Sequence, residues 1–138
     1  FKVLDNSGNV GIGNANPAAK LDVNGQCVNT FGSWSKRADM TLKEAVNPFK
    51  DGLEQVLKIN PITYRFKEEH NLGREEHVGV SAQELQEVAP YMVGKSKMHP
   101  EAKEDHLTMD PGPLTYMLIN AVKELHAEVE SLKKQITR

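Results

Sequence analysis

The spacing of hydrophobic positions changes twice along the chain and divides it into three segments. In residues 1–30, short apolar stretches alternate with polar residues, as at Val10 and Ile12 and again at Leu21 and Val23. A period of two, broken by Asn- and Gly-rich turns, is typical of short β-strands. Such strands cannot bury a core alone, so we expect them to pack against copies from other chains. The alternative, a flexible linker, fits less well because linkers rarely place Val, Ile and Leu in register.

The middle of the chain, residues 38–110, mixes strand and helix patterns and predicts a small α+β domain. The segment "PITYRFKE" (residues 61–68) alternates apolar and polar residues, as a half-buried strand does. In "HVGVSAQELQEVAP" (residues 77–90), a short strand precedes a helix that starts at an S-x-x-E capping box formed by Ser81 and Glu84.

Three further stretches complete the predicted domain. The segment "PFKDGLEQVLKIN" (residues 48–60) places apolar residues on one helical face before Pro61, which predicts a short helix. The segment "GKSKMHPEAKEDH" (residues 94–106) is polar and predicts a solvated loop or an extended hairpin. The segment "HLTMD" (residues 106–110) predicts a short strand.

The last part of the chain, residues 113–137, has the hydrophobic spacing of a coiled-coil helix. Apolar residues at intervals of 4, 3, 4, 3 and 4 form a seam that consists of Leu118, Val122, Leu125, Val129, Leu132 and Ile136. This heptad spacing predicts a helix that assembles with copies of itself. β-Branched residues at a with Leu at d favour two strands, but six positions are too few to fix the number of chains. The alternative is a helix that packs on its own domain.

Composition and charge argue against several classes of partner. The net charge is −2 with 26% charged residues and no basic patch, so we expect no nucleic-acid partner and no membrane binding. The single cysteine, Cys27, cannot form an internal disulfide or a thiolate metal site, and the histidines lack metal-ligand spacing. We therefore expect no metal and no cofactor. The first residue is Phe1 rather than Met, so we expect the sequence to be a piece of a longer protein.

Three blocks of the sequence occur together in a recognisable order and spacing. They are "ADMTLKEAV" (residues 38–46), "HVGVSAQEL" (residues 77–85) and "LTYMLINAVKELHAEVESLKK" (residues 114–134). Together they resemble the C-terminal intramolecular chaperone domain of phage tailspikes, tail fibres and endosialidases, an auto-processing domain also found in myelin regulatory factor. The upstream segment "NVGIGNANPAAKLDVNG" (residues 9–25) resembles the β-structured fibre sequences that precede this domain.

The resemblance implies a homotrimer, in which the domain helps three stalk strands of the same polypeptides find their register. It implies a division into residues 1–37, the end of a β-rich fibre stalk, and residues 38–138, the chaperone with its coiled-coil helix at 113–137. It also implies that the protein folds in the bacterial host cytoplasm and then belongs to the phage virion tail. If the chaperone is cleaved off, it is absent from the mature particle. The implied trimer outweighs the two-strand preference of the seam.

The resemblance also implies a self-cleaving serine–lysine dyad in "KRADMTLKEAVNPF", residues 36–49, which otherwise looks like an ordinary helix start. The family's nucleophile matches Ala38, its general base matches Lys43, and the attacked carbonyl belongs to Arg37. A serine hydroxyl is a poor nucleophile until a base removes its proton. A lysine acts as that base only if burial or neighbouring groups lower its pKa. Because Ala38 has no hydroxyl, we predict that this chain does not cut its own 37–38 bond.

Asp39, His77 and Gln83 are possible supporting residues of this site. His77 has an equally plausible structural interpretation as a strand or interface histidine. Two positions depart from the family pattern, which commonly has Arg at the position of Thr41 and Asn at that of Ala45.

Two explanations of Ala38 fit the sequence: an engineered Ser→Ala change that traps the precursor, or a natural member that keeps its chaperone. We favour the engineered change, because residues upstream of the bond are present and a cleaving protein would have lost them. Two functions therefore stay open, a folding chaperone with disabled cleavage and a permanent trimerisation cap of a fibre or adhesin. The register of Asp39, Leu42 and Lys43 favours the first, since a cap has no need of it.

Overall fold

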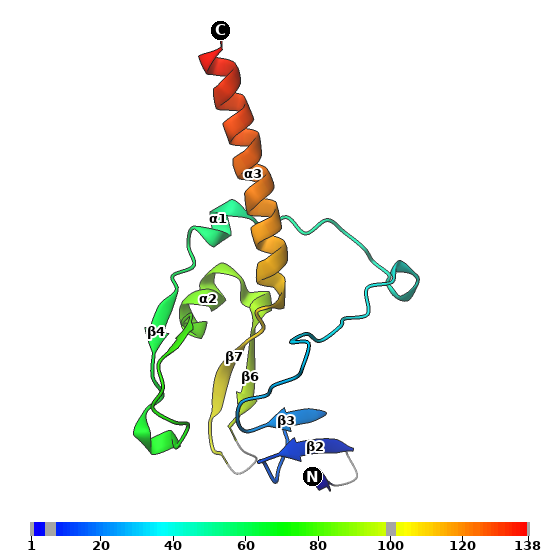
Figure 1. Ribbon diagram of the computed structural model, residues 1–138, viewed down its shortest axis with the longest axis vertical. Coiled ribbons are helices and arrows are strands. Elements are labelled where there is room, and N and C mark those ends of the chain that lie inside the picture. Colours follow the sequence, from blue (N-terminus) through cyan, green and yellow to red (C-terminus); the bar gives the residue numbers. More distant parts are fainter. Residues whose placement is uncertain (1, 5–7, 99–101, 138) are drawn as a thin grey trace. The chain divides into compact units, whose positions relative to one another are not determined.

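The computed structural model describes residues 2–4, 8–98 and 102–137. Helices and small sheets occur in one chain, and a long helix forms its last part (Figure 1), which confirms the mixed α+β fold class. The chain divides into two compact units, which consist of Phe1–Asn47 with Lys95–His106 and of Pro48–Gly94 with Leu107–Arg138.

The first unit contains a three-stranded sheet in the segment that predicted strands. β2 (Asn9–Ile12) lies between β1 (Lys2–Leu4), to which it is antiparallel, and β3 (Leu21–Val23), to which it is parallel. The parallel register places Val10 beside Leu21, so apolar side chains of both strands share one face. Because Leu21 and Ile12 remain about half exposed, this sheet does not bury its own apolar residues.

Residues 24–50 are exposed and contain a single helical turn, η1 (Met40–Leu42), of the 3-10 type. The helix start expected in residues 36–49 is therefore wrong beyond this turn. The backbone of Ala45 has a φ of 52°, in the left-handed region, which ends any right-handed helix at this point. The Asn47 side-chain amide donates a hydrogen bond to the Ala45 carbonyl at 3.0 Å and supports the turned backbone.

The second unit has a small core between its helices. Four buried residues pack together, namely Leu85, Ala89, Met92 and Met117. Leu85 belongs to α2 (Ala82–Val88), Met92 to the short η3 (Pro90–Met92) and Met117 to α3 (Gly112–Ile136), and Ala89 lies between α2 and η3. Val56 of α1 (Leu53–Val56) packs against them.

Two predicted strands of this unit pair as a hairpin-like sheet. β4 (Ile62–Tyr64) and β5 (His77–Gly79) are antiparallel, with Tyr64 opposite His77. The short η2 (Glu68–His70) lies between them in the chain. The predicted cap of α2 is confirmed, since the Ser81 hydroxyl accepts a hydrogen bond from the Glu84 N–H at 3.3 Å.

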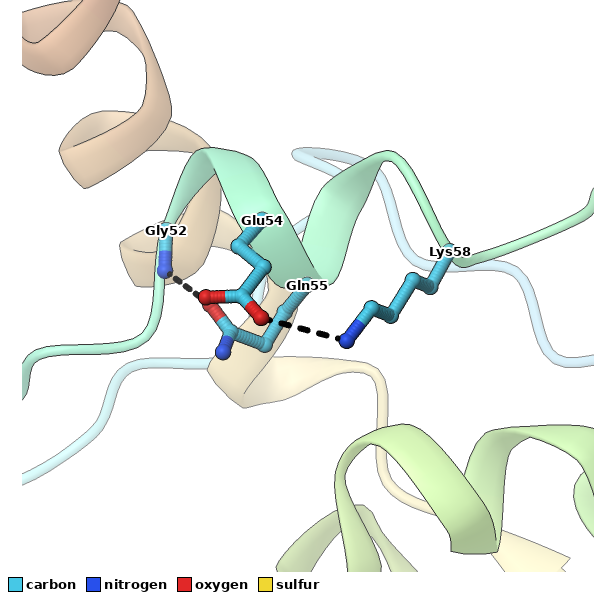
Figure 2. A network of polar contacts seen from close by, with 4 residues as sticks. All are labelled: Gly52, Glu54, Gln55 and Lys58. Atoms are coloured by element: carbon cyan, nitrogen blue, oxygen red, sulfur yellow. Dashed lines mark hydrogen bonds and ion pairs between the residues drawn. The ribbon is translucent and has the colours of Figure 1, made fainter.

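The helix predicted in residues 48–60 is present but only one turn long. Figure 2 shows how α1 begins: the Gly52 N–H donates to the Gln55 side-chain oxygen at 2.9 Å. On the solvent side, the Lys58 ammonium and the Glu54 carboxylate pair at 3.2 Å, four residues apart. Leu57, the apolar residue that follows α1, is 74% exposed, so it does not share a buried face with Val56.

The polar segment at residues 94–106 begins within β6 (Val93–Lys97) and ends within β7 (Asp105–Met109), and these two strands are paired. Residues 99–101 of this segment lie outside the described residues. Of the two interpretations given above, an extended hairpin therefore fits the strands better than a simple loop, and β7 confirms the strand predicted at 106–110.

Candidate functional site

The long helix α3 has two different faces. Met117 and Ala121 are buried against the rest of their own unit, and they lie on one side of the helix. Successive helical residues are about 100° apart, so Leu118 and Val122 lie beside this buried face and not on it. The helix therefore packs on its own domain, as the alternative interpretation expected, only through the face that contains Met117.

The seam itself is exposed along its whole length. Its side chains expose between 45% and 82% of their surface, and they are Leu118, Val122, Leu125, Val129, Leu132 and Ile136. Outside the seam, charged residues occur on α3 only from Lys123 onward, and Tyr116 and Ile119 in its first half are further exposed apolar residues. The helix is confirmed from Gly112 to Ile136, and its seam is a continuous apolar stripe without a partner among the described residues. Assembly through this stripe stays a prediction.

The candidate cleavage segment lies in the exposed part of the first unit. The chain turns once between Ala38 and Lys43, because the Leu42 N–H donates to the Asp39 carbonyl and the Lys43 N–H to the Met40 carbonyl, both at 3.1 Å. This turn lies between position 38 and Lys43, the two positions that the resemblance pairs as nucleophile and base. Ala38 offers no hydroxyl to attack the Arg37 carbonyl.

Asp39 has a clear structural role in this segment. Its carboxylate accepts hydrogen bonds from the Thr41 N–H and from the Thr41 hydroxyl, each at 2.9 Å. The backbone bond, and then the hydroxyl bond, lower the pKa of Asp39 below its ordinary value of 3.8. Asp39 therefore caps the turn η1 that lies between Ala38 and Lys43.

Lys43 is exposed to solvent in the single chain. A lysine amine becomes a general base near neutral pH only where burial or positive neighbours disfavour its charged form. The exposed segment would therefore need cover from another part of the assembled protein before it could work as a site.

His77 and Gln83, the other possible supporting residues, belong to the second unit. The His77 ring lies 5.4 Å from the Tyr64 ring and 5.5 Å from the Phe66 ring, measured between centroids. Its Nε2 atom is buried and has no hydrogen-bond partner in the described part of the chain. Gln83 is exposed, and its side-chain oxygen accepts a hydrogen bond from the Ser81 hydroxyl at 3.4 Å. His77 thus has a packing role and Gln83 a place beside the α2 cap.

Sequence reasoning missed two polar residues of α3 that hold the chain segment around Gly52. The Asn120 side-chain amide donates to the carbonyls of Phe49 and Asp51, and the Glu124 carboxylate accepts from the Leu53 N–H. One signal was available, because Asn is unfavourable in the interior of a helix unless its side chain has a specific partner.

Within the ranges that the structure describes, no group of three or more His, Cys, Asp or Glu side chains is arranged to hold a metal ion. None of the helices in the same ranges has the length and apolar character that crossing a bilayer demands.

Comparison with known proteins gives two matches that agree. Residues 38–94 match the family described as "Chaperone of endosialidase". The sequence is 32% identical to long tail fiber protein Gp37 of Enterobacteria phage K3 over 103 residues, which are 72% of the chain. Long tail fiber protein Gp37 of Enterobacteria phage T2 matches with the same identity over the same length. The matched region covers 8% and 7% of those two proteins, so the chain spans only a small part of the length of these relatives.

Proposed function

We propose that this chain, a member of the chaperone-of-endosialidase family by its residues 38–94, is the intramolecular chaperone of a phage tail fibre. In this proposal three copies join through the seam of α3 and hold three stalk segments, residues 1–37, in register while the stalk folds. The observation that carries the proposal is the exposed seam, an apolar stripe of heptad spacing that the single chain leaves in water.

Exposed apolar residues outside the seam also support assembly with further copies of the same chain. In the first unit, Phe31 exposes 93% of its surface and Trp34 exposes 79%. Large apolar side chains left in water indicate a surface that a partner covers.

Early trimerisation would solve a kinetic problem of the stalk. Stalk strands from three chains must form many contacts between residues far apart, which is slow and leaves aggregation-prone edges exposed. Joining the chains first at α3 makes the later steps effectively intramolecular and raises the local concentration of the strands. The names of the two phage relatives support a place in the virion tail. Folding in the host cytoplasm before that is part of the proposal.

The proposed release step is serine–lysine autoproteolysis at the 37–38 bond. With serine at position 38, its hydroxyl oxygen would attack the Arg37 carbonyl carbon while Lys43 Nζ takes the proton. Lys43 would then give the proton to the amide nitrogen as the peptide bond breaks, which leaves an ester between Arg37 and the serine. Hydrolysis of this ester by water yields the Arg37 carboxylate and restores the hydroxyl. In the present chain Ala38 disables the first step.

A second function, a permanent trimerisation cap, is favoured by one observation, the missing hydroxyl at Ala38. The two functions share the trimer and differ in the chemistry, so the test is to restore the hydroxyl. Ala38→Ser should give pieces of 37 and 101 residues by intact-mass measurement. Ala38→Ser with Lys43→Ala should stay whole, and Lys43→Arg should not replace Lys43, because a guanidinium does not release its proton near neutral pH. A trimeric Ala38→Ser protein that stays whole would favour the cap.

A further inference from the structure

A group of hydrogen bonds holds residues 49–53 against α3. The Asn120 amide donates to the Phe49 carbonyl at 2.8 Å and to the Asp51 carbonyl at 2.9 Å. One helical turn further on, the Glu124 carboxylate accepts from the Leu53 N–H at 2.6 Å. Because an amide NH₂ group has two hydrogens, Asn120 spends its full donor capacity on this backbone.

The clamp formed by Asn120 and Glu124 requires a glycine beneath it. A Cβ atom at Gly52 would lie 2.7 Å from a Glu124 carboxylate oxygen, which is closer than such atoms approach one another. Gly52 is buried, so the carboxylate occupies the space that a side chain would take. The bond from the carboxylate to the Leu53 N–H is charge-assisted and therefore stronger than a neutral one.

A third contact fixes the same backbone from the side of η3. The Tyr91 hydroxyl donates to the Asp51 carboxylate at 2.6 Å, and its ring meets the Phe49 ring edge-on at 5.6 Å between centroids. Burial and then the Asp51 carboxylate raise the pKa of Tyr91 far above its ordinary value, so the phenol stays a donor. Residues 49–53 are therefore held from two sides.

The clamp connects the candidate cleavage segment with the helix that carries the seam. Its backbone part begins six residues after Lys43. Its side chains alternate on α3 with the first seam residues, since Asn120 lies between Leu118 and Val122 and Glu124 directly precedes Leu125. The helix that carries the seam is thus tied by side chains to the chain that leads back to the candidate dyad.

We propose that Asn120 and Glu124 are positioning residues that couple assembly of the seam to the cleavage segment. This rests on the proposed function, because it concerns the cleavage that serine at position 38 would perform. When α3 is fixed in the trimer, the clamp also fixes the backbone at residues 49–53. The segment that carries Lys43 leads directly into this backbone, so its C-terminal end is held in place. The clamp is expected to set the cleavage rate without being needed for the seam itself.

The test measures assembly and cleavage separately in the Ala38→Ser background. Protein is diluted from denaturant, trimer is separated by size exclusion, and cleavage of the trimer is followed by intact mass. Asn120→Ala and Glu124→Ala should assemble normally and lower the cleavage rate constant within the trimer by about 10²-fold, as a displacement near 1 Å does elsewhere. Glu124→Gln keeps an acceptor for the Leu53 N–H and should retain most of the rate. Ser131→Ala and Glu130→Ala, further along the same helix, are the controls and should cleave normally.

Different failures have different meanings in this experiment. Normal cleavage rates in both alanine variants would overturn the coupling role of the clamp. A loss of trimer in proportion to the loss of cleavage would also overturn it, because the residues would then serve only folding. If Ala38→Ser alone stays whole, the proposed release step is wrong. The clamp is then decided in the Ala38 chain by amide hydrogen exchange. Asn120→Ala should speed exchange from Lys43 to Leu53 in the assembled protein, and unchanged exchange would overturn it.

Discussion

A carboxylate placed in the seam should abolish assembly and leave the single chain folded. Leu125 is the perturbation of choice, because it lies in the middle of the seam and exposes 46% of its surface in the single chain. In Leu125→Asp the new carboxylate remains in water as long as the chain is alone. In a parallel trimer three such carboxylates would meet in one layer of the interface.

The expected effect is large. About half of Leu125 is still to be buried on assembly, so its loss removes about 1 kcal/mol of burial per chain. Taking each carboxylate out of water costs several kcal/mol more, and no cation of the seam pairs with it. Three chains together should lose on the order of 10 kcal/mol, or about seven orders of magnitude in the association constant.

Sedimentation equilibrium over a range of micromolar concentrations measures this effect, and far-ultraviolet circular dichroism reports whether the chain remains folded. The matched control is Ala127→Asp, which adds the same charge to an exposed position of α3 outside the seam. The unchanged chain and the control should be trimers, and Leu125→Asp should be a monomer. A trimeric Leu125→Asp protein, or a monomer for the unchanged chain, would refute assembly through the seam.

Two smaller predictions concern the candidate cleavage segment. Because the pKa of Asp39 is lowered below its ordinary value of 3.8, its cap bonds persist above that value and are lost as pH falls through the lower folded-state pKa. The amide chemical shift of Thr41, followed by NMR, should therefore titrate below pH 3.8. A titration at or above pH 3.8 would contradict the cap. Ala45 has a φ of 52°, and asparagine tolerates this left-handed region better than alanine does. Ala45→Asn should therefore raise the free energy of unfolding, measured by urea titration, by up to about 1 kcal/mol. A lower free energy of unfolding would contradict this interpretation.

Local patterns along the chain were sufficient to predict most of the regular elements. The heptad spacing from Leu118 to Ile136 predicted α3, and the capping box at Ser81 predicted the start of α2. Both are properties of neighbouring residues, which one sequence contains. The alternation of Val10 and Ile12 predicted β2 in the same way.

Features that depend on distant residues were not predictable. The segment after Met40 has the composition of a helix, yet the left-handed Ala45 turns it, and no local pattern gives this conformation to an alanine. The bonds from Asn120 and Glu124 to residues 49–53 join positions about 70 residues apart in the sequence. For the dyad, the resemblance supplied the pairing of position 38 with Lys43, which spacing alone does not establish.

The central claim, that residues 38–138 are a folding chaperone for the stalk, is tested most directly by removing them. The stalk that the proposal places before residue 38 is expressed with and without residues 38–138, and the soluble, protease-resistant stalk is measured in each case. The account predicts soluble trimeric stalk from the complete chain and mostly insoluble stalk from the truncated one. Equal yields of soluble, native stalk from both would contradict it.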